Sequence, residues 1–256
     1  MIMNIVDLSG DGYKLTPSYL LIMCIEHSAR YHMELQTRQL LIKMSNAIQS
    51  VASEKTAEMS KTIERTTIPE KALEELLPQL RPVVFWMANC LEMLPYLQGN
   101  MSQYIKDPSQ IAEYGDETLL NADEELLMFL EEVIIYTFQQ TVYHLTKVLY
   151  IALPAILDTN PFQDTDEDSD KRPQEVETVI SIFQTTYDVV KAYSVHEDIL
   201  RQLFAYLFFF TNASLFNTLM ERGAGASSTA GLKERRFGQS GCVGELGCRG
   251  ATSGRG

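Results

Sequence analysis

The segment from Pro82 to Leu94 constrains the fold of this chain more than any other, because it places the only tryptophan of the sequence, Trp86, in a helical pattern. Its apolar side chains recur at the i, i+3, i+4, i+7, i+10 spacing that puts them on one face of an α-helix. They are Val84, Met87, Ala88, Leu91 and Leu94. The spacing by itself predicts a core helix and indicates no catalytic chemistry.

Apolar residues recur at helical spacing along most of the chain, whereas no alternating strand pattern and no fixed-period repeat is visible. The sequence therefore predicts an all-α fold in which six to eight helices pack in one domain. The expected helices cover residues 16–31, 40–63, 70–77, 82–95, 121–153, 174–190 and 194–219.

Proline positions set several of the expected boundaries. Pro78 and Pro82 separate a short helix, residues 70–77, from the helix of Trp86, which is expected to end or kink at Pro95. In the first helix, the expected buried side is that of Leu20, Met23, Cys24 and His27.

The start of the last helix has a capping pattern of its own. Ser194 and Glu197 have the S-x-x-E spacing of a capping box, in which each side chain bonds a free backbone N–H of the first turn. The sequence therefore predicts that Ser194 is the N-cap of this helix.

The composition changes after Arg222. Ten of the fourteen glycines lie in residues 223–256, where the sequence predicts a disordered tail, because so little apolar surface cannot offset the entropy of ordering. This tail has five basic and two acidic residues, a charge of +3, so residues 1–222 carry −16 of the formal net charge of −13. So acidic a body repels phosphates, which argues against nucleic-acid binding.

Cysteine usage and hydropathy indicate a cytoplasmic protein. Cys24 and Cys90 sit in apolar helical patterns, and no C-x-x-C pair is present, so a reducing compartment is expected. The N-terminus has no basic region typical of a signal peptide. The longest apolar runs, such as residues 203–210, are shorter than the ~18–20 residues of a membrane span, so no transmembrane segment is expected.

Four stretches together resemble the dilute domain, the helical module of myosin V tails, afadin and the Ras-associating, dilute-domain proteins. The first is the run Phe85-Trp86-Met87-Ala88-Asn89 with Glu92-Met93-Leu94. The others are residues 14–21 with 25–29, residues 131–140 with 149–155, and residues 205–210 with Asn217 and 221–223. Together they are most similar to Ras-associating and dilute domain-containing (Radil-like) proteins and to the related Ras-interacting protein.

The resemblance covers about Lys14 to Gly223 and implies a partial dilute domain at residues 14–222, a lead-in at 1–13 and an unrelated tail at 223–256. Family members carry a Ras-associating domain before this region and usually a PDZ domain after it. Neither is in this chain, nor is the C-terminal part of the dilute domain. The expectation is therefore a fragment or a truncated gene product.

The family implies a non-enzymatic adaptor of Rap-type Ras-family GTPases in cell adhesion and migration signalling. Its GTPase contact is expected on the absent Ras-associating domain. The implied location is the cytoplasm, peripherally at cell junctions or the plasma membrane. Two alternatives stay open: a cargo-binding tail module of myosin V type, and a non-functional truncated product.

The candidate partner site is aromatic. A single helix cannot bury Phe204, Tyr206, Phe208, Phe209 and Phe210 together, because they point in different directions around its axis. Some must pack against a second neighbour, or they form an exposed groove for a partner helix or peptide. The residues assigned to such a groove are Trp86, Tyr206, Phe208, Phe209 and Phe210.

Other candidate sites are weaker. Residues 164–175 place acids at several EF-hand positions, but Ser169 stands where the sharp turn requires glycine, so a solvated acidic loop is the better interpretation. Thr165 and Ser169 precede acids and are candidate phosphorylation sites. Cys24 and His27 have no second pair of ligands to complete a zinc site, and Glu131 and Glu132 diverge too far on a helix to act as a dyad. No catalytic, cofactor or metal residue is therefore expected.

Overall fold

The structure, a computed structural model, describes residues 14–31, 34–62, 68–104, 122–158 and 173–239, with side chains described as far as Arg222. Every regular element within these ranges is an α-helix, which confirms the all-α fold. The helices are α1 (Thr16–Arg30), α2 (Glu34–Thr62), α3 (Pro69–Tyr104), α4 (Ala122–Ile156), α5 (Gln174–Ala192) and α6 (Glu197–Gln239).

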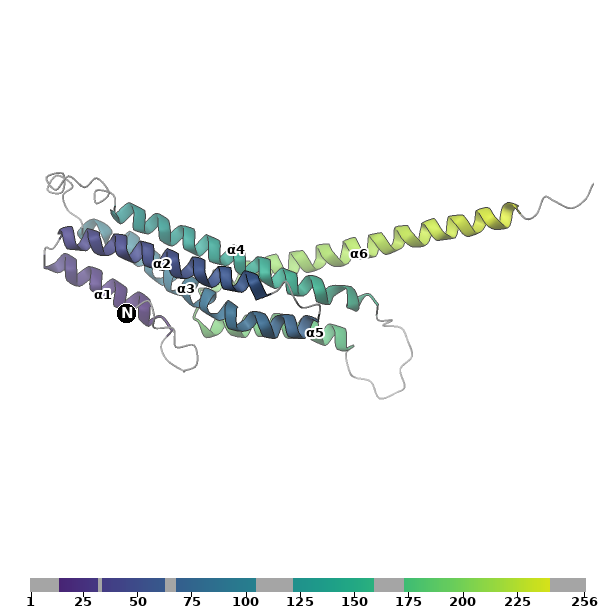
Figure 1. Cartoon of the computed structure of the whole chain (residues 1–256), viewed down its shortest axis with the longest axis horizontal. Coiled ribbons are helices and arrows are strands. Elements are labelled where there is room, and N and C mark those ends of the chain that lie inside the picture. Colours follow the sequence, from purple (N-terminus) through teal and green to yellow (C-terminus); the bar gives the residue numbers. More distant parts are fainter. Residues whose placement is uncertain (1–13, 32–33, 63–67, 105–121, 159–172, 240–256) are drawn as a thin grey trace, which may run out of the picture.

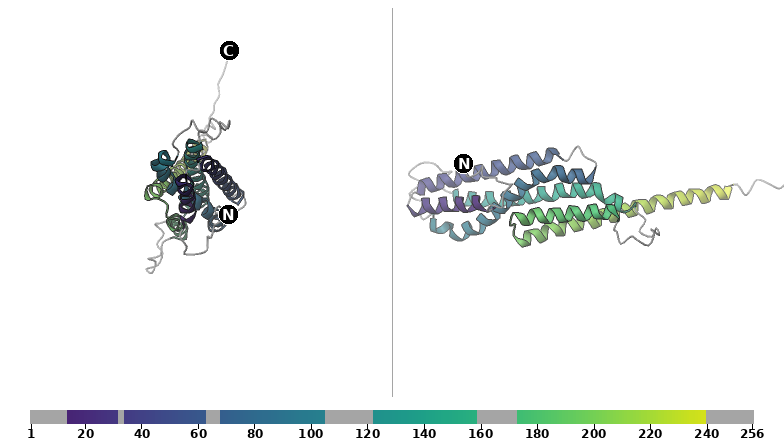
Figure 2. Two further views of the ribbon diagram at one scale, coloured as in Figure 1. Left: turned by 90° about the vertical axis from the view of Figure 1, so that its left-hand side faces the viewer. Right: turned by 90° about the horizontal axis from the view of Figure 1, so that it is seen from below.

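Two long helices form the centre of an elongated bundle. Helix α3 packs against α1, α2, α4 and α5, and helix α4 packs against α2, α3, α5 and α6. Helices α1 and α2 lie along one half of this central pair, and α5 and α6 lie along the other half (Figures 1 and 2). The core therefore runs along α3 and α4, and α4 contacts both halves.

Helix α3 corrects the predicted boundaries at proline. It is continuous for 36 residues, with Pro78, Pro82 and Pro95 inside it, so residues 70–77 and 82–95 belong to one helix. An interior proline removes a backbone hydrogen bond and costs about 3 kcal/mol. The residues that flank the prolines offset this cost because they are buried against neighbouring helices. Burial of each large apolar side chain contributes roughly 1.5–3 kcal/mol of stability. They include Leu76, Leu80, Val83 and Val84.

Helix α1 turns a different face to the core than its sequence predicts. The buried side chains are those of Pro17, Ser18, Leu21, Ile22 and Ile25, whereas Met23, Cys24 and His27 are exposed. The rotation of α1 is fixed by Asn89 of α3. The Asn89 Oδ1 accepts a hydrogen bond of 3.0 Å from the backbone N–H of Ser18, and its Nδ2 donates to the carbonyl oxygens of Lys14 and Phe85.

The predicted capping box at the start of α6 is wrong. The helix begins at Glu197, and Ser194 lies before it in the left-handed region with φ of 58°. His196, immediately before the helix, supplies the cap instead, because its Nδ1 accepts a hydrogen bond of 3.3 Å from the backbone N–H of Asp198.

The end of α6 also differs from the predicted end of the last helix at residue 219, because the helix continues to Gln239. Residues 240–256 lie outside the described part of the chain. Adding residues to a helix that is already formed is much easier than nucleating one, and this favours the extension.

Candidate functional site

Helices α4 and α6 lie side by side and run in the same direction (Figure 2). Helix α5, which joins them in the sequence, runs in the opposite direction. Their register is nearly constant. Phe138 meets Tyr206, with ring centroids 6.0 Å apart. Further along, Arg222 Nη1 donates to the carbonyl oxygen of Leu157 at 3.1 Å and pairs with Asp158 at 2.8 Å. Residues about 65 positions apart in the sequence therefore face each other along the pair.

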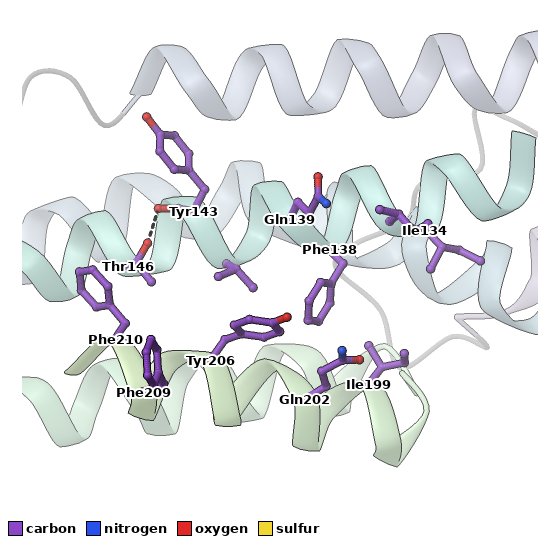
Figure 3. Close-up of a pocket in the computed structure, with 12 residues that line it drawn as sticks. Ile134, Phe138, Gln139, Tyr143, Thr146, Ile199, Gln202, Tyr206, Phe209 and Phe210 are labelled. Carbon is purple, nitrogen blue, oxygen red and sulfur yellow. Dashed lines mark hydrogen bonds between the residues drawn. The ribbon is translucent and has the colours of Figure 1, made fainter. Parts of the chain in front are cut away.

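An apolar groove of about 710 Å³ lies between these two helices. Side chains from α4 form one wall and side chains from α6 form the other, and Figure 3 shows the rings of Phe138 and Tyr206 meeting between them. Two glutamines add amide groups, and none of the described residues that line the groove carries a charge. Its lining includes Ile134, Phe138, Val142, Ile199, Tyr206 and Phe209.

Three of the five residues predicted to form a partner groove come together here. Tyr206, Phe209 and Phe210 all line the groove, and the side chains of Tyr206 and Phe209 are 49% and 74% exposed. Large apolar side chains that are exposed next to one another form a patch of the kind found at interaction sites, whereas single exposed ones are common on protein surfaces.

Trp86 does not belong to the groove. Its side chain is 1% exposed and packs edge to face on Phe85, with ring centroids 5.6 Å apart. It is among the largest fully buried side chains of the described core. The helical pattern that suggested a core helix was therefore the better guide to this residue than its rarity in the sequence.

Phe208 lies on the other side of α6, toward α5. Its ring stacks on Phe183 with centroids 4.9 Å apart, and Phe204 lies near both. Both Phe204 and Phe208 line a second cleft, between α5 and α6, together with Tyr187 and Lys191. The aromatic residues of α6 thus divide between two neighbours, as one of the two sequence interpretations required.

The α4 wall is the part of the site that sequence reasoning missed. The sequence of this helix is apolar on most sides, which is typical of a helix covered by neighbours, yet four large apolar side chains on it are exposed at spacings of seven or eight residues. They are Met128, Ile135, Tyr143 and Tyr150. That spacing returns to the same helix face every two turns and was the available signal.

A buried polar pair lies elsewhere on α4. His144 is fully buried, and its Nε2 lies 3.3 Å from the Ser60 Oγ on α2. Burial lowers the pKa of His144 from 6.5 to about 4, with a smaller contribution from the nearby Lys147 cation. The imidazole is therefore neutral at pH 7. Burial likewise raises the pKa of the Cys90 thiol to about 12, so this cysteine is an unreactive core residue.

The remaining sequence candidates do not come together in the described residues. Glu131 and Glu132 are both exposed, and Glu131 accepts a hydrogen bond from the Gln98 amide. His27 packs against Tyr31, with ring centroids 4.6 Å apart. No group of three histidine, cysteine or acidic side chains able to hold a metal occurs in the described part. The acidic loop with Thr165 and Ser169 lies outside the described residues.

Helix α6 also bears on the expectation that no segment is long enough to cross a membrane. Residues Glu197–Arg222 form a helix that is long and apolar enough to do so, so the expectation does not hold by length and composition. One such helix is weak evidence of a span. Leu203 and Leu207 of this helix are buried in the bundle.

Comparison with known proteins places the chain among longer relatives, although no family model and no solved structure matches it. It is 39% identical over 246 residues to the Ras-associating and dilute domain-containing protein of Danio rerio, covering 87% of this chain and 22% of that protein. The human protein of the same name is 36% identical over 88% of this chain and 22% of its own length.

Ras-interacting protein 1 of Mus musculus is 38% identical over 232 residues, which cover 85% of this chain and 24% of that protein. The chain therefore spans less than a quarter of the length of these relatives. By this shared sequence, it belongs to the family of Ras-associating and dilute domain-containing proteins and Ras-interacting protein 1, and corresponds to one segment of them.

Proposed function

We propose that this chain is a non-enzymatic interaction module of an adaptor that acts downstream of a Ras-family GTPase. The observation that carries the proposal is the uncharged, apolar groove between α4 and α6. Such a surface suits recognition of a partner through burial of apolar area. The names of the relatives, which are Ras-associating or Ras-interacting proteins, support the connection to a GTPase.

Within this proposal, the GTPase binds to a Ras-associating domain outside the present segment, and the GTPase is of the Rap type. The module contributes protein contacts that serve cell adhesion and migration, in the cytoplasm and peripherally at junctions or the plasma membrane. The acidic body of residues 1–222, with a charge of −16, is compatible with protein partners and disfavours nucleic acid.

Depletion of the gene product in cells that express an activated Rap GTPase tests this function. We expect Rap-driven adhesion to a matrix-coated surface to fall, and expression of a depletion-resistant copy to restore it. Activated Ras in place of Rap is the matched control and should give no dependence on this protein. Unchanged adhesion after depletion, with the loss of the protein verified by immunoblot, would contradict the proposal.

A further inference from the structure

The groove between α4 and α6 is bordered on each helix by a stripe of exposed apolar side chains that no described helix covers, and on α4 the polar Gln139 and Thr146 lie between them. On α4 the stripe contains the four exposed side chains at seven- and eight-residue spacing, and on α6 it continues beyond Tyr206 and Phe209 to Phe216 and Met220, which are also exposed. Each stripe keeps to one face because its spacings match whole turns of an α-helix. Two parallel helices with facing apolar stripes lack the third helix that would complete the packing.

The length of the groove matches a helix of several turns. Its lining, with that of the adjoining hollow at Tyr150, extends on α4 from Ile134 to Ile151. That length corresponds to about 25 Å, or roughly five helical turns at 1.5 Å per residue. Because the register of α4 and α6 is nearly constant, the groove runs parallel to the axes of both helices.

The charged side chains around the groove differ between its two ends. At the end near Ile134 and Ile199, the exposed acids are Glu131 and Glu132 on α4 and Glu197 and Asp198 on α6. Arg201 is the only basic side chain on the first two turns of α6, where it pairs with Glu197 at 2.8 Å and with Asp198 at 3.2 Å. Toward the other end, Lys147 lies over the Tyr143 ring and Arg222 pairs with Asp158. One end is therefore acidic and the other nearly neutral.

We propose that the groove binds an amphipathic helix of a partner protein, about five turns long, whose apolar stripe packs between α4 and α6 and whose basic end lies against Glu132 and Asp198. Charge complementarity selects this occupant over a second copy of the chain, because two bodies of charge −16 repel each other. The inference rests on the proposed function, since it names the partner chemistry of the same groove.

The orientation follows from the same charges. A helix C-terminus carries partial negative charge that basic residues offset, so a basic end at the C-terminus of the partner is favoured. The partner helix then runs antiparallel to α4 and α6, and its C-terminal turn lies over the acidic end of the groove.

Fluorescence anisotropy with the full chain and two synthetic peptides tests the proposal. Both peptides are about 18 residues long, the length of about five turns, with leucines at helical spacing. One carries lysines in its last turn and the other carries glutamines there. We expect both to bind, and the lysine peptide to bind more tightly at low salt than at high salt.

Two variants locate the binding. Phe209→Asp, at a side chain that is 74% exposed, should weaken the binding of both peptides at least ~10-fold because it places a charge on the apolar α6 wall of the groove. Met23→Asp, at an exposed apolar side chain on α1, is the matched control and should leave binding unchanged. Glu132→Lys should weaken the lysine peptide by ~3–10-fold and spare the glutamine peptide, whereas Glu74→Lys on α3 should affect neither.

Other results overturn the inference. They are an absence of peptide binding, or equal binding to the wild type and Phe209→Asp when circular dichroism shows both folded. A dimer in sedimentation velocity that Phe209→Asp dissolves would assign the groove to a second copy. Co-sedimentation with phosphatidylcholine–phosphatidylserine vesicles, lost in Phe209→Asp, would assign it to a membrane. Failure of peptide binding with intact Rap-dependent adhesion removes this inference and leaves the proposed function in place.

Discussion

At the scale of single residues, His144 couples the stability of the bundle to pH. Its pKa is about 4 in the folded chain and 6.5 in an exposed histidine, so the unfolded chain binds more protons between these values. The free energy of unfolding therefore rises with pH between pH 4 and 6.5. The stability that neutral His144 contributes is fully present above pH 6.5 and is lost as the pH falls toward 4. The side chain acts as a destabilising group in acid.

The pH dependence can be measured by urea unfolding at pH 7 and at pH 5. The His144 contribution should remove about 2 kcal/mol of stability between these conditions. The variant His144→Gln should show a smaller difference between the two pH values, although it is less stable at pH 7. His27→Gln, which removes an exposed histidine outside the core, serves as the control and should keep the wild-type difference. An identical difference in His144→Gln would contradict the assignment.

The contrast between Trp86 and Phe209 gives a second prediction. Trp86→Ala should reduce the free energy of unfolding by about 3–5 kcal/mol, because it leaves a cavity in the core. Phe209→Ala should change it by less than about 0.5 kcal/mol, since that side chain is mostly exposed. Equilibrium denaturation in urea measures both. A small loss for Trp86→Ala would mean that this side chain is at the surface.

At the scale of elements, the three prolines in α3 show how packing outweighs local preference. Pro78 is exposed inside the helix, in its third turn, where it removes a backbone hydrogen bond without burying its ring. Pro78→Ala should therefore stabilise the protein by about 1–3 kcal/mol, the interior cost of proline less its effect on the unfolded chain. The midpoint of thermal unfolding, followed by circular dichroism, tests this. A decrease in the midpoint would indicate that the helix is interrupted there, as the sequence predicted.

The sequence predicted the helices well because their periodicity records burial directly. It failed where the outcome depends on a neighbour. Helix α1 has apolar residues on two faces, and its contacts with α3, among them the hydrogen bonds of Asn89 with Ser18 and Lys14, decide which face is buried. The groove could be predicted only in part, because Phe209 and Tyr206 become one of its walls only when α6 lies parallel to α4. That pairing is a property of the tertiary fold.

At the scale of the whole molecule, the last described contact between α6 and the rest of the bundle is that of Arg222 with Asp158 and Leu157. A chain shortened to residues 1–222 should therefore unfold as cooperatively as the full chain, with a free energy of unfolding within about 1 kcal/mol. Loss of cooperativity in this chain would show that residues 223–256 are needed for folding.

The control is a chain that ends at His196. It lacks all of α6 and so exposes the α4 face against which α6 packs. We expect this shorter chain to remain helical by circular dichroism and to melt without a cooperative transition. The half of the bundle that contains α5 and α6 has then lost one of its two outer helices.

The burial of Trp86 also has an optical consequence. It is the only tryptophan of the chain and lies inside the core rather than in the groove. Its emission spectrum should therefore be blue-shifted in the native protein, move to longer wavelength on unfolding, and stay unchanged when a ligand fills the groove. In a single sample, the tryptophan emission thus reports whether the core is intact, while a labelled ligand independently reports occupancy of the groove.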